Sequence, residues 1–228
     1  MQNDHAGSKA YSPFLGDDLE KWGENLPALV EINVPDKTLI YREGDRCTKV
    51  FWIIKGVVKL SVMTEQGNEL TTALLRRGEI FGSLQSESLQ ETKETAQAVG
   101  EVRAYQINRD AFKSLLSQQP RLSWWFIEAL CAQRQQAERK LQNILTQTVE
   151  MRVLGTLKEL SEVFGVRCVH GYALEIRLTQ QDLADLVGAS RSVVSTVMNE
   201  LRRRGMLDYT RDLICINDPA LSDLRTAS

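Results

Sequence analysis

The sequence predicts an α+β protein with an N-terminal antiparallel β-roll, a long helix, and a small C-terminal domain of helices closed by a hairpin. Short strand-like runs separated by glycines occupy residues 33–108, a helical repeat of apolar residues follows Pro120, and a second helical region with its own cap signals begins near Thr179. With 228 residues and 43% hydrophobic side chains, the chain is long enough for two domains with buried cores.

The strand-like runs of the roll are "KTLIYREGD", "KVFWIIKGVVKLSV", "ELTTALLRRGEIFGSL" and "ETAQAVGEVRAYQI". Several short strands about 8 to 12 residues apart are typical of an antiparallel roll or barrel. Gly44, Gly56, Gly67 and Gly78 are expected where the chain reverses, because glycine tolerates positive φ. The preceding segment, residues 17–31, is expected to form one or two short helices packed against the roll.

From Pro120 to about Leu145 the pattern is helical, with residues repeating at alternating spacings of three and four. Such a heptad seam predicts two helices packed along their length, and a homodimer is favoured because polar residues flank a narrow stripe. Packing of the stripe on the chain's own core is the alternative. Arg134 is a polar residue in this seam, and three roles are open for it. It fixes the register of the two helices, contacts a ligand, or extends its aliphatic stem outward to solvent. The seam positions are Ile127, Leu130, Arg134, Ala137, Leu141 and Ile144.

The stretch "LTQQDLADLVGASRSVVSTVMNELRRRGML" predicts two helices joined by a tight turn. Thr179 and Asp182 are spaced as a capping box, so a helix is expected to begin near Gln180. Gly188 is expected in the turn and Ser190 as the cap of the second helix. The positions expected to bury the contact between the helices are Leu183, Ala184, Val187, Ala189, Val194 and Val197.

The second of these helices presents a polar face and ends in three adjacent arginines. This pattern predicts a helix-turn-helix that binds double-stranded DNA, with polar side chains near base edges and the arginines beside phosphates. A solvated helix end is the alternative for each arginine. The net charge of −2 does not oppose DNA binding, because the position of the basic groups decides it. The expected DNA-binding residues are Thr179, Gln180, Ser190, Arg191, Ser192, Ser195, Thr196, Asn199, Arg202, Arg203 and Arg204.

With these motifs, and with "GEIFGSL" and "TVEMRVLGTL", nearly the whole chain resembles the CRP/FNR family of bacterial transcription regulators, named after the cyclic-AMP receptor protein. The resemblance implies a cyclic-nucleotide-binding-like jelly roll over residues 1–119, a dimerisation helix over 120–147 and a winged helix-turn-helix over 148–228. It also implies a homodimer on a near-palindromic operator, with RNA polymerase as a further partner.

The resemblance places an effector pocket at Phe81, Gly82, Ser83, Leu84, Thr92 and Lys93 of the roll and at Arg134, Ala137 and Glu138 of the long helix. Cyclic-AMP binders have a glutamate where Ser83 stands and an arginine–serine pair where Thr92 and Lys93 stand. They have a threonine–serine pair in place of Ala137 and Glu138. Without the guanidinium fork, the cyclic phosphate has no bidentate partner, so cyclic AMP is not expected as the effector.

The residues that bind other effectors of the family are also missing from this chain. The chain resembles the cyanobacterial nitrogen regulators that sense 2-oxoglutarate in "GVVKLSVMTEQGNELTTALL", but Thr92 and Glu128 stand where arginines hold the acid. His5 and His170 lie outside the roll, which disfavours haem, and no cysteine cluster precedes Cys47, which disfavours an iron–sulfur centre. The effector is of another kind, or there is none.

Several classes of protein are disfavoured because the sequence lacks their characteristic motifs. Two histidines and no Gly-x-x-x-x-Gly-Lys loop argue against an enzyme. The four cysteines are scattered, which predicts buried thiols without a metal or a disulfide. No signal peptide and no long apolar run are visible, so a cytoplasmic protein that does not bind membranes is expected. The remaining alternative is a ligand-binding regulatory subunit that uses the roll.

Overall fold

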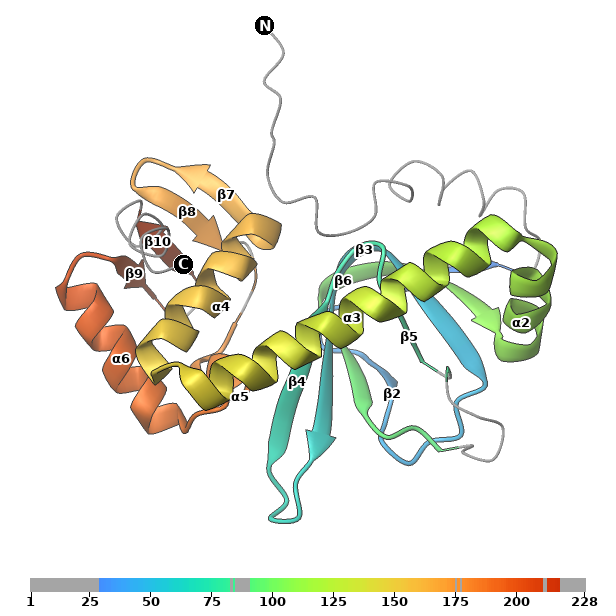
Figure 1. Ribbon diagram of the computed structural model, residues 1–228, viewed down its shortest axis with the longest axis horizontal. Helices are drawn as coiled ribbons and strands as arrows, with labels where there is room; N and C mark the ends of the chain where they lie inside the picture. The colour runs from blue at the N-terminus through green and yellow to red at the C-terminus, as the bar shows by residue number, and fades with distance from the viewer. Residues whose placement is uncertain are drawn as a thin grey trace, which may run out of the picture. The chain divides into compact units, whose positions relative to one another are not determined.

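The computed structural model describes residues 29–82, 84, 91–174, 176, 178–210 and 213–217 (Figure 1). The chain divides into two compact units, and the division falls between Gln135 and Gln136. The first unit contains β1 (Val30–Val34), β2 (Leu39–Tyr41), β3 (Lys49–Met63), β4 (Glu69–Leu75), β5 (Ile80–Gly82), β6 (Thr95–Asn108), α2 (Arg109–Gln118) and the first part of α3 (Pro120–Thr146). The second contains the rest of α3, α4 (Val149–Phe164), β7 (Gly165–Cys168), β8 (Gly171–Leu174), α5 (Gln180–Val187), α6 (Arg191–Arg203), β9 (Leu207–Tyr209) and β10 (Ile214–Asn217).

The strands of the first unit form one antiparallel sheet around two long central strands. Its order is β1-β6-β3-β4, with β2 paired to β6 and β5 paired to β3. β3 and β6 have 15 and 14 residues, long enough to pair with different partners at their two ends. The predicted antiparallel β-roll is therefore confirmed.

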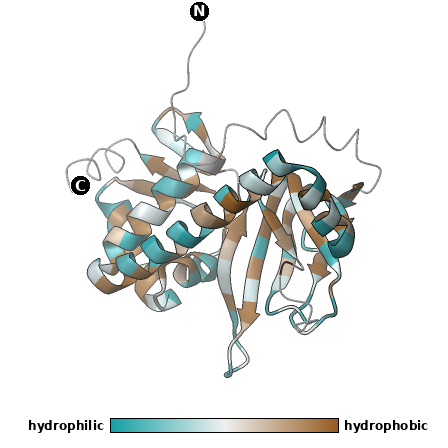
Figure 2. Ribbon diagram, turned by 45° about the vertical axis from the view of Figure 1, so that its right-hand side comes forward, coloured by the Kyte–Doolittle hydropathy of each residue, from teal (hydrophilic) through white to brown (hydrophobic). Residues whose placement is uncertain are grey.

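β3 contributes side chains to two separate cores because successive residues of a strand point to opposite faces. Phe51, Ile53 and Val58 belong to the core inside the roll. Val50, Trp52 and Ile54 belong to a second core with α2 and the start of α3, in which the Trp52 and Trp125 rings stack 4.9 Å apart. Figure 2 shows this apolar character along the strands of the roll. The long run of apolar residues in "KVFWII" reflects burial on both faces.

Gly56 was expected at a chain reversal, and that expectation is wrong. Gly44, Gly67 and Gly78 do lie in turns, but Gly56 lies inside β3, where the register with β6 shifts. Its φ is +92°, and a Cβ there would collide with the Glu101 carbonyl oxygen. The glycine forms a bulge that bends the strand, rather than a turn.

The segment expected as N-terminal helices, residues 17–31, falls mostly outside the described residues. Its last two residues, Val30 and Glu31, form the start of β1 and pair with Gln106 and Tyr105 of β6. At this end the helical expectation is wrong, because pairing with a long neighbouring strand outweighs the local helical pattern.

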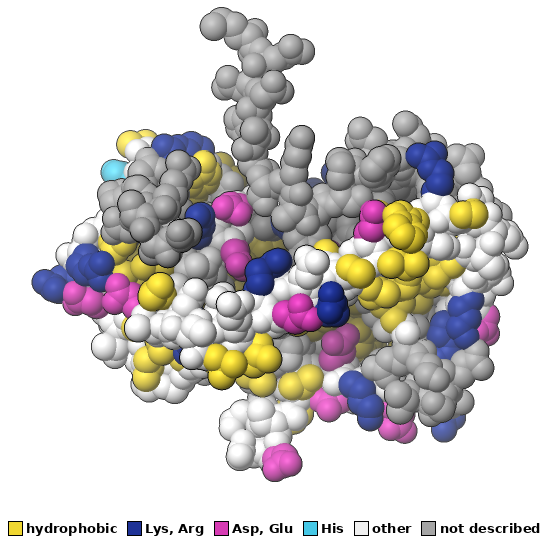
Figure 3. All heavy atoms as spheres, in the orientation of Figure 1, with side chains coloured by type: hydrophobic (Ala, Val, Ile, Leu, Met, Phe, Trp, Pro, Cys, Tyr) yellow, Lys and Arg dark blue, Asp and Glu magenta, His cyan; other side chains and the backbone are white. Residues whose placement is uncertain are grey.

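The predicted long helix is present as α3, which has 27 residues. Leu122 and Trp125 bury its first turns against the roll. The seam residues further along lie exposed: Ile127 is 48% exposed, Leu130 42% and Leu141 59%. Figure 3 shows hydrophobic side chains gathered on the surface where the first part of α3 runs. Within the described residues, no helix is long and apolar enough to cross a membrane.

In the second unit, α4 packs against α5, α6 and a four-stranded antiparallel sheet of order β7-β8-β10-β9. The predicted closing hairpin forms as β9 and β10. The strand expected over residues 173–178 is instead β8, which begins at Gly171 and ends at Leu174, and its partner β7 was not predicted. The short β7 follows α4 directly and is half-buried at most, so it lacks the apolar alternation that reveals a strand.

The cysteines do not match the expectation of scattered, buried thiols. Cys131 is exposed, and the other three are half-buried. Cys168 and Cys215 meet, with their Sγ atoms 3.5 Å apart. The pairing of β7 and β10 with β8 brings these two residues together although 47 positions separate them.

Candidate DNA-binding site

The first helix of the motif, α5, begins where the capping signal predicted. The Thr179 hydroxyl accepts a hydrogen bond from the Asp182 backbone N–H at 3.0 Å, and the Asp182 carboxylate accepts one from the Thr179 N–H at 3.1 Å. This reciprocal pair satisfies two amides that would otherwise lack partners at the helix start. Of the two residues expected here as DNA contacts, Thr179 is exposed and Gln180 is half-buried.

The turn between α5 and α6 has the predicted geometry. Gly188 ends α5 in the left-handed conformation, with φ +65°, and the Ala189 N–H donates to the Ala184 carbonyl at 3.0 Å. Ala184 is fully buried, so a larger side chain there would push the helices apart. Leu183, Val187 and Val194 are buried as expected, whereas Ala189 and Val197 are half-buried.

Met198 and Leu201, which were not predicted, complete the buried side of α6. With Val194 they follow a spacing of four and three residues, so the helical repeat of the sequence contained the signal. Because this stripe faces the domain core, the opposite side of α6 is turned outward.

The second helix of the motif, α6, presents the predicted polar face. The Ser190 hydroxyl caps it by accepting from the Val193 N–H at 3.4 Å, and lies 3.0 Å from the Ser192 hydroxyl. Arg191, Ser192 and Thr196 are exposed and Ser195 is half-buried. Arg191 makes no hydrogen bond or ion pair with any other described residue, so its guanidinium is available to a ligand.

Each arginine of the cluster that ends α6 has an acidic partner. Arg203 binds Glu200 through two nitrogens, at 2.9 and 2.7 Å. Arg204 lies 2.5 Å from Glu150 at the start of α4, and Arg202 lies 2.9 Å from Asp208 on β9. Figure 3 shows basic and acidic side chains side by side in this region.

These pairs alter the electrostatics without removing the basic groups. The hydrogen bond from Arg203 lowers the pKa of Glu200, so this carboxylate is ionised at neutral pH. All three arginines are exposed, and exposed ion pairs contribute little stability. Breaking these ion pairs therefore costs little.

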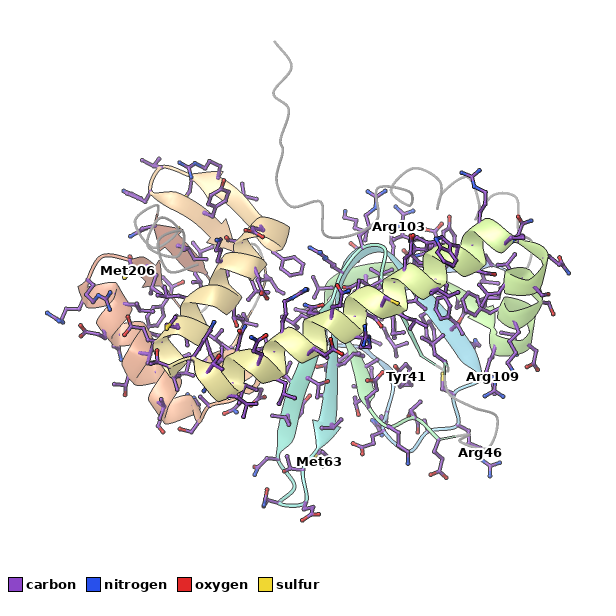
Figure 4. All side chains as sticks on the ribbon, viewed as in Figure 1. Tyr41, Arg46, Met63, Arg103, Arg109 and Met206 are labelled. Atoms are coloured by element: carbon purple, nitrogen blue, oxygen red, sulfur yellow. The ribbon has the colours of Figure 1, made fainter. Side chains whose placement is uncertain are left out.

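Asn199, the remaining predicted contact on α6, is exposed, and its side-chain oxygen accepts from the Tyr209 hydroxyl at 2.8 Å. The Tyr209 ring also lies under Arg202, 5.5 Å from the guanidinium carbon. β9 therefore holds two of the predicted DNA-binding side chains. The turn between α6 and β9 contains Met206, labelled in Figure 4, whose N–H donates to the Leu201 carbonyl.

A second group of unpredicted residues joins the end of α3 to the turn of the motif. Arg152 on α4 donates to the Ile144 carbonyl at 2.9 Å and to the Gly188 carbonyl at 3.4 Å. Lys140 is partly buried, which lowers its pKa, and the charge of Asp185 on α5 opposes that shift. Arg152 and Gly188 are 36 positions apart, so only the fold brings the turn of the motif to the end of α3.

The expected effector residues of the roll are only partly available for ligand binding. Phe81 is buried, Leu84 is exposed, and Gly82 has φ +101°; Ser83 lies outside the described residues. The three residues expected on α3, Arg134, Ala137 and Glu138, are exposed. Arg134 belongs to the first unit, and Ala137 and Glu138 belong to the second.

Thr92 and Lys93 differ in their surroundings. The buried Thr92 hydroxyl donates to the Arg42 carbonyl at 2.5 Å, and its N–H donates to the Asp45 carbonyl at 2.9 Å. These bonds tie Thr92 to the turn after β2. Lys93 is exposed.

The interior of the roll nearby contains an aromatic group and a carboxylate. The rings of Tyr41, Phe51 and Phe81 lie within 6.1 Å of one another, and Tyr41 is labelled in Figure 4. The Tyr41 hydroxyl donates to the Glu94 carboxylate at 3.0 Å. Burial raises the pKa of Glu94 and also that of Tyr41.

Comparison with known proteins extends over both units. The cyclic nucleotide-binding domain family matches residues 31–119, and the Crp-like helix-turn-helix domain family matches residues 151–221. The global nitrogen regulator of a Nostoc species is 28% identical over 196 residues, which cover 85% of this chain and 87% of that protein. A CRP-like cAMP-activated global transcriptional regulator of Mycobacterium tuberculosis is 27% identical over 192 residues, 83% of this chain and 85% of the relative.

Among solved structures, a transcriptional regulator of the CRP/FNR family from Thermus thermophilus is 28% identical, with a TM-score of 0.66. The match covers 86% of this chain and 97% of that one. The helix-turn-helix match favours a DNA-binding regulator over the alternative of a regulatory subunit that uses the roll alone. Because the two domain families together match most of its residues and the relatives cover most of its length, the chain belongs to the CRP/FNR family of DNA-binding transcription regulators.

Proposed function

We propose that the protein acts as a homodimer on a near-palindromic operator, with α6 of each subunit in the major groove. The observation that carries the proposal is the exposed polar face of α6, which begins at the Ser190 cap and includes Arg191. A recognition helix contacts base edges with its N-terminal residues. In this proposal Arg191 donates two hydrogen bonds to guanine O6 and N7, and Ser192, Ser195 and Thr196 contact the DNA beside it.

The arginines at the other end of α6 serve a different purpose in this proposal. In this proposal the phosphate backbone passes Arg202, Arg203 and Arg204, and each arginine exchanges its carboxylate partner for a phosphate oxygen. The partners Asp208, Glu200 and Glu150 hold the guanidinium groups in place in the unbound protein. Such contacts position the helix and carry no direct sequence information.

The exposed seam of α3 supports the homodimer. Ile127, Leu130 and Leu141 would leave large apolar side chains in water in a monomer, and a second copy of α3 would bury them. A twofold dimer presents two copies of α6 to two half-sites about one helical turn apart. We propose RNA polymerase as a further protein partner.

For the effector, we propose a ligand other than cyclic AMP, or activity without a ligand. The Thr92 hydroxyl is already bonded within the roll, and Lys93 supplies only a single exposed cation. The nearby Glu94 carboxylate opposes an anionic phosphate. Millimolar cyclic AMP is expected to leave both the melting temperature and the operator affinity unchanged. A saturable rise in the melting temperature would contradict this part of the proposal.

The experiment that tests DNA recognition is selection from a library of randomised duplexes, followed by affinity measurements on the selected sequence. Specific binding is expected to be at least about a thousand times tighter than binding to an unrelated duplex at the same salt concentration. An Arg191→Ala variant serves as the comparison. Selection of no consensus, by a protein shown to be folded, would contradict the proposal.

A further inference from the structure

Two thiols meet in the sheet of the second unit. Cys168 ends β7 and Cys215 lies in β10, on opposite sides of β8, and their Sγ atoms are 3.5 Å apart. The residue of β8 paired with Cys168 is Gly171, where a Cβ would collide with the Ile216 carbonyl oxygen. The missing side chain lets β8 approach β10 closely, and this brings the thiols together.

We propose that Cys168 and Cys215 form a reversible disulfide when the protein meets a hydroperoxide. Disulfide sulfurs lie about 2 Å apart, so the two Sγ atoms need to approach by roughly 1.5 Å. In the turn after β7, the Val169 side chain is 93% exposed and packs against little of the fold. This turn can supply part of the movement through Cys168, and β10 supplies the rest through Cys215.

The two thiols are suited to different steps of the oxidation. A backbone hydrogen bond from His170 lowers the pKa of Cys168, whereas burial raises the pKa of Cys215. Cys168 is therefore the thiol that ionises first and attacks the oxidant. Cys215 stays protonated until the second step.

The reaction balances with one hydroperoxide. The Cys168 thiolate attacks one peroxide oxygen, the O–O bond breaks, and the product is a sulfenic acid, with water or an alcohol released after protonation. The Cys215 sulfur then attacks the sulfenic sulfur, the S–O bond breaks, and hydroxide leaves with the thiol proton as water. Each thiol loses one electron to the peroxide, and a small thiol restores both by exchange.

Metal binding is the other chemistry available to a thiol pair. It requires further ligands, and among the described residues no three His, Cys, Asp or Glu side chains form a group that could hold a metal ion. The observations therefore favour oxidation.

Oxidation is connected to the proposed DNA contacts through the neighbouring strand. Cys215 is paired directly with Asp208 of β9, and the Asp208 carboxylate holds Arg202 at 2.9 Å. Drawing Cys215 toward Cys168 shifts β10 against β9, and Arg202 loses its position. This consequence rests on the proposed function, because it treats Arg202 as a phosphate contact.

The test begins with fully reduced protein treated with one equivalent of hydrogen peroxide. Non-reducing peptide mass spectrometry is expected to show a cross-link between Cys168 and Cys215, with two of the four thiols lost. Operator affinity is expected to fall about threefold or more, as when one arginine no longer binds its phosphate, and to recover with dithiothreitol. A Cys47→Ser/Cys131→Ser variant should respond like the wild type, whereas Cys168→Ser should show neither effect.

The possible results separate the claims. Intermolecular cross-links, sulfinic acid without a disulfide, or unreacted thiols would overturn the proposed site. A disulfide that leaves operator affinity unchanged would overturn only its connection to Arg202. Failure of the reduced protein to bind any operator would contradict the proposed function and leave the disulfide result to be judged by mass spectrometry.

Discussion

At the scale of single residues, Gly188 has two reasons to be glycine. Its φ of +65° lies in the left-handed region, and a Cβ would come within 3.1 Å of the Ile144 side chain. Gly205 provides a matched control, since its φ is +70° and nothing lies within 4 Å of a Cβ there.

We expect Gly205→Ala to cost about 1 kcal/mol of stability through backbone strain alone, and Gly188→Ala to cost about 0.5 to 1 kcal/mol more. Chemical denaturation of both variants measures this difference. Equal losses of stability in the two variants would show that the Ile144 side chain moves away from the new Cβ without an energetic cost.

Arg191 and Arg203 should respond differently to removal because one is proposed to read a base and the other to bind phosphate. Arg191→Ala should cost about 1 to 3 kcal/mol of operator binding and relax the preference at one base pair per half-site. Arg203→Ala should weaken all duplexes about equally and lower the salt slope by about one unit for each phosphate that is no longer bound. Affinities on matched operator variants across a salt series compare the two. Uniform weakening by Arg191→Ala would make that residue another phosphate contact.

Glu94 gives the stability of the roll a pH dependence of defined sign. Burial raises its pKa in the folded protein, so its contribution is fully present below the unfolded pKa of about 4.3 and is lost as pH rises through the folded value. Glu94→Gln should retain an acceptor for the Tyr41 hydroxyl and raise the melting temperature at pH 7.5 by about 2 °C. The gain should vanish near pH 4.

Thermal melts between pH 4 and 8 measure the effect, with the exposed Glu65→Gln as the control. A Glu94→Gln variant that melts below the wild type at pH 7.5 would show that the carboxylate stabilises the roll.

At the scale of elements, the sequence was most informative where structure depends on neighbours in the chain. The Thr179 capping box, the left-handed Gly188 and the Ser190 cap were all predictable, because each rests on residues within a few positions. Met198 was missed although its helical spacing was visible. The short β7 was missed because it carries no apolar alternation.

Contacts that depend on tertiary structure could not be predicted in the same way. Arg204 meets Glu150 across 54 positions, and Cys168 meets Cys215 across 47. The sequence therefore placed the basic cluster correctly at the end of its helix but did not reveal that Arg204 is paired with Glu150. The same limitation hid the thiol pair.

The exposed seam of α3 gives a prediction for the element as a whole. Leu130→Asp combined with Leu141→Asp should place unpaired charges in the seam and give monomers of 25.8 kDa. Ile144 is a less suitable target, because its side chain also lies beside Gly188 and its replacement would disturb the DNA-binding turn. Sedimentation measures the mass, and Leu145→Asp, 76% exposed and outside the seam, is the matched control. An unchanged dimer in the double variant would contradict the role of the seam.

At the scale of the whole molecule, the β-roll, long helix and helix-turn-helix were predictable because the pattern of each is long and regular. The effector was not, since the residues at the expected pocket positions differ from every set that the family resemblance supplied. Thr92 illustrates the reason: its place in the sequence suggested a ligand contact, while its hydroxyl is bonded to the Arg42 carbonyl.

The central claim is that two copies of α6, held by the α3 seam, read two half-sites together. The most direct test measures affinity for the selected operator, for a single half-site, and for an operator with about 5 base pairs inserted at its centre, which rotates one half-site to the opposite face of the duplex. We predict that the half-site and the spaced operator both bind at least about a hundredfold more weakly than the intact operator. Equal affinity for all three duplexes would contradict the account.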